Sequence, residues 1–157
     1  MAKVSRRSIW VFHLNTGGCN ACDIEVLDAL TPFHDAERFG VKLVASPRHA
    51  DVVLMTGPIT IESLPKVINA IEAMPRPRVL VALGSCGVGG GIWHDTYSTL
   101  GGVEALKKIL RERGVEVDAL YYVPGCPVRP EAVLYAVALI RRQVPKKARG
   151  TIANALP

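Results

Sequence analysis

The chain has 157 residues, of which 49% are hydrophobic and 21% are charged, so it can form one domain with a core and is not a disordered chain. Its apolar runs are shorter than the ~20 residues of a membrane-spanning helix. The basic start is not followed by the long apolar stretch of a secretory signal. We therefore expect a cytosolic location, where cysteines bind metals more often than they form disulfides.

The formal net charge of +5 is concentrated at the two ends of the chain. Residues 1–8 carry three basic residues and residues 141–157 carry five, without an acid in either segment. We predict a domain over residues 9–143, with basic tails over 1–8 and 144–157. The tails are either solvated ends or segments that dock onto a partner subunit or an anionic membrane surface. The domain between them lacks the basic, aromatic-interleaved stripe of nucleic-acid-binding proteins.

Apolar runs alternate with helical periodicities along the chain. Runs bounded by glycine or proline predict five strands, over residues 9–14, 41–44, 51–56, 78–83 and 119–123. Helical spacing of apolar residues predicts four helices, over residues 23–30, 61–73, 103–113 and 130–142. In the first helix Ile24, Leu27 and Leu30 share one side. This order predicts a flavodoxin-like α/β domain with a doubly wound parallel sheet of about five strands.

The four cysteines each follow a predicted strand. Cys19 and Cys22 follow the first strand, Cys86 follows the fourth and Cys126 follows the fifth. Because the carboxyl ends of parallel strands share one edge of a sheet, we expect the four thiols to converge there. Each cysteine stands near glycine or proline, and glycine lets the backbone approach a bound group closely and present N–H groups to sulfur.

Four converging thiols can hold a [4Fe–4S] cluster or a zinc ion. Structural zinc sites generally use two close cysteine pairs, whereas here only Cys19 and Cys22 form one, which favours the iron–sulfur cluster. A zinc site would make the chain a structural interaction module. Two further interpretations are buried free cysteines and a thioredoxin-like pair at Cys19 and Cys22, which would leave Cys86 and Cys126 without a role.

An ordered series of motifs runs through the chain: Gly18-Cys19-Asn20-Ala21-Cys22-Asp23-Ile24-Glu25, Thr56-Gly57-Pro58, Gly84-Ser85-Cys86 and Pro124-Gly125-Cys126-Pro127. In these motifs the chain resembles the small electron-transfer subunit of membrane-bound, energy-converting [NiFe] hydrogenases. That subunit is related to the complex I 20 kDa subunit. The resemblance covers about residues 9–142.

The resemblance implies that Cys19, Cys22, Cys86 and Cys126 ligate one [4Fe–4S] cluster. It implies electron transfer between a ferredoxin-like subunit and a large catalytic subunit, with no substrate chemistry on this chain alone. The complex would also contain membrane subunits, with this chain peripheral on the cytoplasmic side of the membrane, and would couple H2 evolution to ion translocation. A quinone- or sulfur-reducing complex I-like machine using an equivalent subunit remains an alternative.

Two details bear on the branch of the family. The Cys19-x-x-Cys22 spacing is that of hydrogenase-type subunits, whereas complex I homologues typically have adjacent cysteines at this place. Val128 stands where the family often has a second proline after the last cysteine, a departure that removes no ligand.

Further polar residues near the cysteines have two interpretations each. Glu25, together with Asp23, either complements the positive end of a helix or serves as a proton relay or large-subunit contact. Arg129 either donates hydrogen bonds near the cluster or pairs with a partner. The four histidines are expected to be structural or at an interface: His13, His34, His49 and His94.

The glycine-rich segment after Cys86 resembles a phosphate-binding loop. It lacks the Lys-Ser/Thr of a P-loop and the spacing of a dinucleotide fingerprint. We expect its backbone to pack close to the cluster or to a partner, and we expect no flavin, because the cysteines occupy the edge where flavin would lie.

Overall fold

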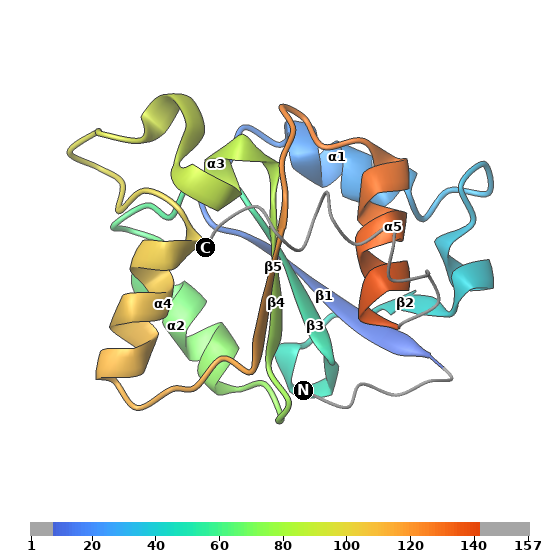
Figure 1. Ribbon diagram of the computed structural model, residues 1–157, viewed down its shortest axis with the longest axis horizontal. Coiled ribbons are helices and arrows are strands. Elements are labelled where there is room, and N and C mark those ends of the chain that lie inside the picture. Colours follow the sequence, from blue (N-terminus) through green and yellow to red (C-terminus); the bar gives the residue numbers. More distant parts are fainter. Residues whose placement is uncertain (1–7, 142–157) are drawn as a thin grey trace.

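Residues 8–141 are described by a computed structural model, shown in Figure 1. Apart from Ser8, the two predicted basic tails, 1–8 and 144–157, lie outside the described residues. Within residues 8–141, none of the helices has the length and apolar character that crossing a bilayer requires.

Five parallel strands form one sheet in the order β2-β1-β3-β4-β5. The strands are β1 (Ile9–Asn15), β2 (Val41–Leu43), β3 (Val52–Thr56), β4 (Val79–Leu83) and β5 (Ala119–Val123). The register aligns the last residues of four strands in one row, from Asn15 through Thr56 and Leu83 to Val123. This edge of the sheet, at the top of Figure 1, therefore carries all the segments that contain cysteine.

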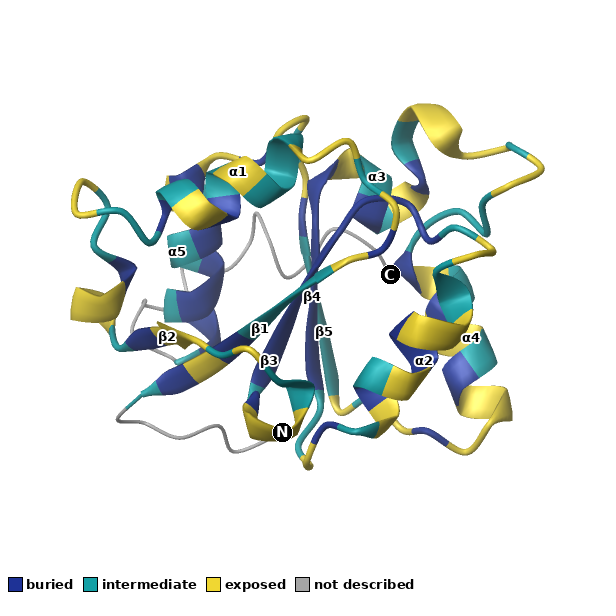
Figure 2. Ribbon diagram, turned by 180° about the vertical axis from the view of Figure 1, so that it is seen from behind, coloured by how far each residue is buried: buried dark blue, intermediate teal, exposed yellow. Residues whose placement is uncertain are grey.

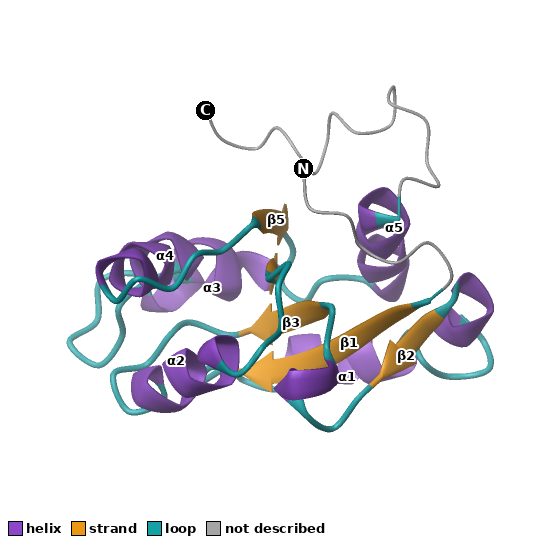
Figure 3. Cartoon of the chain, turned by 90° about the horizontal axis from the view of Figure 1, so that it is seen from below, coloured by secondary structure: helices purple, strands orange, loops and turns teal. Residues whose placement is uncertain are grey.

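Helices cover the sheet on both faces (Figures 1 and 3). One face packs against α1 (Ala21–Asp28) and α5 (Pro130–Ile140), and the other packs against α2 (Leu64–Glu72) and α4 (Val103–Glu112). A short helix, α3 (Gly84–Gly89), begins directly at the end of β4. The central strands β3 and β4 are buried along their whole length, as a sheet between two helical layers requires (Figure 2).

The predicted fold class and the order of the nine predicted elements are confirmed. The structure adds α3 and three turns of 3-10 helix, at Ala36–Phe39, Pro47–His49 and Gly91–Trp93. These elements are shorter than two helical turns, so apolar periodicity does not reveal them.

The predicted apolar side of the first helix is wrong for Ile24 and Leu27, whereas Leu30, just after the helix, packs against the core as predicted. In α1 the side chains of Ile24 and Leu27 are 64% and 56% exposed, whereas Val26 and Ala29 are buried. The buried residues and Cys22, which packs against the core, are spaced by four and three positions and so share one helix face. The helix also begins at Ala21, so that Cys22 lies in its first turn.

This reassignment predicts different stabilities for two leucine variants. Leu106 of α4 is fully buried, so Leu106→Ala should lower the free energy of unfolding by about 2–5 kcal/mol. Leu27→Ala removes the same atoms from an exposed site and should change it by about 0.5 kcal/mol or less. Urea unfolding of both variants checks this, and equal losses would contradict the packing described for α1.

Candidate metal centre

The four cysteines line one hollow at the carboxyl edge of the sheet. Cys19 lies in the loop after β1 and Cys22 in the first turn of α1, while Cys86 lies in α3 and Cys126 in the loop after β5. Thr56 and Gly57, at the end of β3, complete the floor between them. The convergence expected from parallel topology is therefore present in the structure.

The thiols differ in their access to solvent. Cys19 and Cys126 are exposed, Cys22 and Cys86 are partly buried, and all four are free of disulfides. Burial raises the pKa of the Cys22 thiol, the neighbouring Cys19 and Cys86 and the carboxylate of Asp23 raise it further, and the backbone N–H of Val128 opposes the shift.

Cys86 shows the same balance of effects. Burial raises the pKa of its thiol, the neighbouring Cys126 and Cys19 add to the rise, and the backbone N–H of Ile92 opposes it. We call the partly buried thiols of Cys22 and Cys86 the inner thiols. Each of them interacts electrostatically with two other cysteines and accepts a backbone hydrogen bond that would stabilise negative charge on sulfur.

Glycine is required beside both inner sulfurs. Gly84 has a φ of +77°, and a Cβ built on it would lie 2.6 Å from Sγ of Cys22. A Cβ on Gly91, where φ is +55°, would lie 2.8 Å from Sγ of Cys86. The glycine-rich segment therefore packs against sulfur, in agreement with the expectation that its backbone lies close to the site.

Backbone contacts hold the cysteine-bearing segments together. The N–H of Ser85 donates to the carbonyl of Gly125 at 2.7 Å, joining α3 to the loop after β5. Thr16 is fully buried and its hydroxyl donates to the carbonyl oxygens of Thr56 and Gly57, both at 2.9 Å. The bonds of Thr16 therefore join the segment after β1 to the end of β3. The bond of Ser85 joins the segment after β4 to the segment after β5.

A polar network joins the first turn of α1 to the ends of β1 and β3. Oδ1 of Asp23 is 2.6 Å from Nε2 of His13 and accepts a hydrogen bond of 2.6 Å from the hydroxyl of Thr56. Oδ2 of Asp23 accepts from Nδ2 of Asn15 at 2.9 Å. Sequence patterns do not reveal this network, because its members lie on three different elements and the strand register brings them together.

Asn15 also binds the backbone of the cysteine loop. Its Oδ1 accepts from the N–H groups of Gly17 and Gly18, at 2.8 and 2.9 Å. One side chain therefore fixes both the start of the loop and the carboxylate that follows Cys22.

The other candidate residues do not line the hollow. Glu25 is partly buried in α1, and its side chain is not among the lining groups. Arg129 is exposed at the start of α5, where its charge helps to lower the pKa of Glu131, after a backbone hydrogen bond and the neighbouring His34. Roles for Glu25 and Arg129 toward a bound group remain predictions.

The remaining histidines do not line the cysteine hollow. His34 packs between Asp28 and Glu131, with ring nitrogens 3.4 and 3.6 Å from their carboxylates. His49 and His94 are exposed. Their positions are compatible with structural or interface roles, whereas His13 belongs to the polar network of Asp23.

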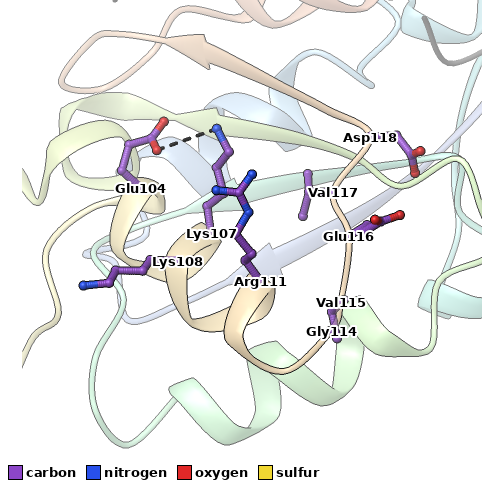
Figure 4. A pocket seen from close by; sticks show the side chains of 9 residues that line it. All are labelled: Glu104, Lys107, Lys108, Arg111, Gly114, Val115, Glu116, Val117 and Asp118. Atoms are coloured by element: carbon purple, nitrogen blue, oxygen red, sulfur yellow. Dashed lines mark ion pairs between the residues drawn. The ribbon is translucent and has the colours of Figure 1, made fainter.

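A second hollow, of about 570 Å³, lies between α4 and residues 114–118, which lead into β5 (Figure 4). Charged side chains of both signs from α4 and from residues 114–118 surround it, and Lys107 pairs with Glu104 at 3.8 Å. It contains no cysteine or histidine, so its chemistry differs from that of the cysteine-lined hollow.

Four cysteine sulfurs around one hollow are a donor set that suits either a zinc ion or an iron–sulfur cluster. A zinc ion requires all four sulfurs at about 2.3 Å from one point. Within residues 8–141, no group of three or more His, Cys, Asp or Glu side chains is arranged closely enough to hold a metal ion. A cluster with bridging sulfides is larger than one ion, so its cysteine ligands lie further apart around a common hollow.

Comparison with known proteins gives the chain a family. The family described as NADH ubiquinone oxidoreductase, 20 kDa subunit, matches residues 19–140. A probable membrane-bound hydrogenase subunit, mbhJ, of Pyrococcus furiosus is 45% identical over 97% of this chain and 85% of its own length. Formate hydrogenlyase subunit 7 of Escherichia coli is 42% identical over 88% of this chain, which spans about half (51%) of that relative.

Solved structures support the same grouping. A chain of the archaeal membrane-bound sulfane sulfur reductase superimposes with a TM-score of 0.69 and 33% identity, covering 88% of this chain and 71% of that one. A chain of the [NiFeSe] hydrogenase of Dm. baculatum gives a TM-score of 0.65 at 16% identity, covering 92% of this chain and 66% of that one. The second match shows a common fold.

The thiol environments predict an order of chemical reactivity. In metal-free protein near neutral pH, iodoacetamide should modify Cys19 and Cys126 several-fold faster than Cys22, because burial limits access and the raised pKa of Cys22 reduces its thiolate fraction. Mass spectrometry of timed samples measures the rates. Urea-unfolded protein is the control, in which the thiols should react alike; equally fast labelling of Cys22 in the folded chain would contradict the burial described.

Gly84→Ala should displace the Cys22 sulfur, and Gly114→Ala offers a matched control. Both glycines have φ near +75°, so either alanine costs about 1–2 kcal/mol in backbone strain. Only at Gly84 does the new methyl group meet a sulfur, since nothing lies within 4 Å of a Cβ at Gly114. We expect both variants to lose similar stability and only Gly84→Ala to lose bound metal on purification. Equal metal content in the two variants would contradict the close contact.

Proposed function

Because the chain belongs to the NADH ubiquinone oxidoreductase 20 kDa subunit family, we propose that it carries one [4Fe–4S] cluster and transfers electrons within a membrane-bound hydrogenase complex. As a member of this family it is a subunit of an oxidoreductase complex, of hydrogenase or complex I type. The observation that carries the proposal is the convergence of four cysteines, from three strand ends, on one hollow.

In this proposal Cys19, Cys22, Cys86 and Cys126 are the ligands. A bound [4Fe–4S] cluster would supply one-electron transfer. The surrounding chain would fix its position and would donate backbone N–H groups, from Val128 to the sulfur of Cys22 and from Ile92 to that of Cys86. Such bonds stabilise negative charge on sulfur and are one means of setting a reduction potential.

The surroundings of the hollow favour docking of other subunits. Cys19 and Cys126 face solvent in the isolated chain, and large apolar side chains are exposed nearby on the segment that follows Cys86. Ile92, whose N–H bonds to Cys86, is 83% exposed, and Tyr97 is 97% exposed. A catalytic subunit or a ferredoxin-like subunit covering these groups would shield the cluster from water and shorten the path for electrons.

The proposed electron path runs between a ferredoxin-like subunit and a large catalytic subunit of [NiFe] type. The similarity to a probable membrane-bound hydrogenase subunit of Pyrococcus furiosus supports a membrane-bound hydrogenase complex. In such a complex the chain would lie peripherally on the cytoplasmic side of the membrane, with membrane subunits that couple H2 evolution to ion movement. The likeness to the sulfane sulfur reductase supports a second candidate, an equivalent subunit in a sulfur- or quinone-reducing complex.

Substitution of the proposed ligands tests the cluster. Each of Cys19→Ala, Cys22→Ala, Cys86→Ala and Cys126→Ala should lose iron and acid-labile sulfide and abolish the electron paramagnetic resonance signal of the reduced cluster. Ser85→Ala is the control, because Ser85 lines the same hollow without contributing a thiol. An unchanged signal in any cysteine variant refutes that ligand.

Nickel content distinguishes the two candidate complexes. The intact complex, purified anaerobically through a tag on this chain, should contain nickel together with iron and should evolve H2 from a low-potential electron donor. Iron without nickel would retain the cluster assignment and move the chain to the sulfur- or quinone-reducing relatives. A nickel-containing complex without H2 activity would contradict the proposed direction of electron flow.

A further inference from the structure

We propose that the carboxylate of Asp23 is a fixed negative charge that lowers the reduction potential of the cluster, and that His13, Asn15 and Thr56 are positioning residues for it. This inference rests on the proposed function, because it requires a cluster on the four cysteines. It assigns a role to a polar network that ligand binding alone does not explain.

Asp23 is part of the wall of the cysteine-lined hollow. Its side chain is 13% exposed and lines the hollow together with the four cysteines, as does Thr56. It directly follows Cys22 in the first turn of α1, so the two side chains leave adjacent positions of one helical turn.

Three side chains bind the two carboxylate oxygens. Oδ1 is 2.6 Å from both Nε2 of His13 and Oγ1 of Thr56, and Oδ2 is 2.9 Å from Nδ2 of Asn15. Since a carboxylate accepts hydrogen bonds and does not donate them, the imidazole, hydroxyl and amide are the donors. Donors of this kind hold the carboxylate in one orientation.

The donors themselves are held by the sheet. His13 and Asn15 belong to β1 and Thr56 to β3, and the register pairs Asn15 directly with Thr56. Asn15 also accepts hydrogen bonds from the N–H groups of Gly17 and Gly18, which lead into Cys19. The carboxylate and the cysteine loop are therefore fixed by the same strand end.

The carboxylate of Asp23 and the sulfur of Cys22 line the same hollow, so the field of the carboxylate acts on a group bound there. Reduction adds one negative charge, so a fixed negative neighbour disfavours the reduced form and lowers the potential. In a site shielded from water by partner subunits the effect is larger than in bulk solvent.

Asp23→Asn tests the charge with little change in shape. In the anaerobically purified complex, we expect the ratio of reduced to oxidised cluster at a fixed potential to rise about tenfold, which is ~59 mV for a one-electron couple. A redox titration followed by electron paramagnetic resonance measures the ratio. Glu112→Gln is the control, because it removes an exposed carboxylate of α4 outside the site and should leave the ratio within about twofold.

Two further variants separate the charge from the structure. Asp23→Ser is a second uncharged variant that can still bond to Thr56, and it should shift the potential in the same direction. Asn20→Asp adds a carboxylate to the wall of the hollow and should shift the potential the opposite way. Asn20 occupies the N-cap position of α1, without a side-chain capping bond, at a φ of +70°, a conformation that aspartate also tolerates.

The outcomes distinguish the inference from the proposed function. Absence of iron and sulfide from the unmodified chain would refute the proposed function itself. A cluster in the unmodified chain with an unchanged potential in Asp23→Asn would overturn the inference alone. Loss of the cluster from both uncharged variants would also overturn it, because Asp23 would then be a structural requirement and not a tuning charge.

Discussion

The site depends on the parallel register that places the ends of four strands in one row. Asn15, Thr56, Leu83 and Val123 are neighbours across β1, β3, β4 and β5. Every segment that leaves this row starts at the same edge of the sheet, so cysteines up to 107 positions apart in the sequence line one hollow. A shift of one residue in any of these strands would turn its side chains to the opposite face and separate the cysteines.

Around this row, the chain combines close packing with polar contacts. Positive-φ glycines let the backbone pass within contact distance of the inner sulfurs, where any other residue would push the sulfur aside. Burial by itself disfavours charge on these thiols, and backbone N–H groups from two neighbouring segments offset part of that cost. The result is a preorganised set of four sulfur donors that is buried on its inner side and open to solvent on the other.

Much of this arrangement could be predicted from the sequence, because the informative features are local. Continuous apolar runs mark the buried strands β3 and β4, and the alternation of strands with helices predicts parallel pairing. Parallel pairing then predicts where Cys86 and Cys126 lie. The features that escaped prediction depend on tertiary contacts. The exposed position of Leu27 follows from how α1 packs, and the bonds of Asp23 to His13 and Thr56 join residues 10 and 33 positions away.

The metal content of the anaerobically purified chain tests the central claim most directly. Iron, acid-labile sulfide and zinc should be measured on the same sample, with Mössbauer spectra to identify the iron species. The account predicts iron and sulfide in equal amounts, the spectrum of a single [4Fe–4S] cluster, and no stoichiometric zinc. Stoichiometric zinc without iron, in protein never exposed to air, would contradict the account and make the four cysteines a structural metal site.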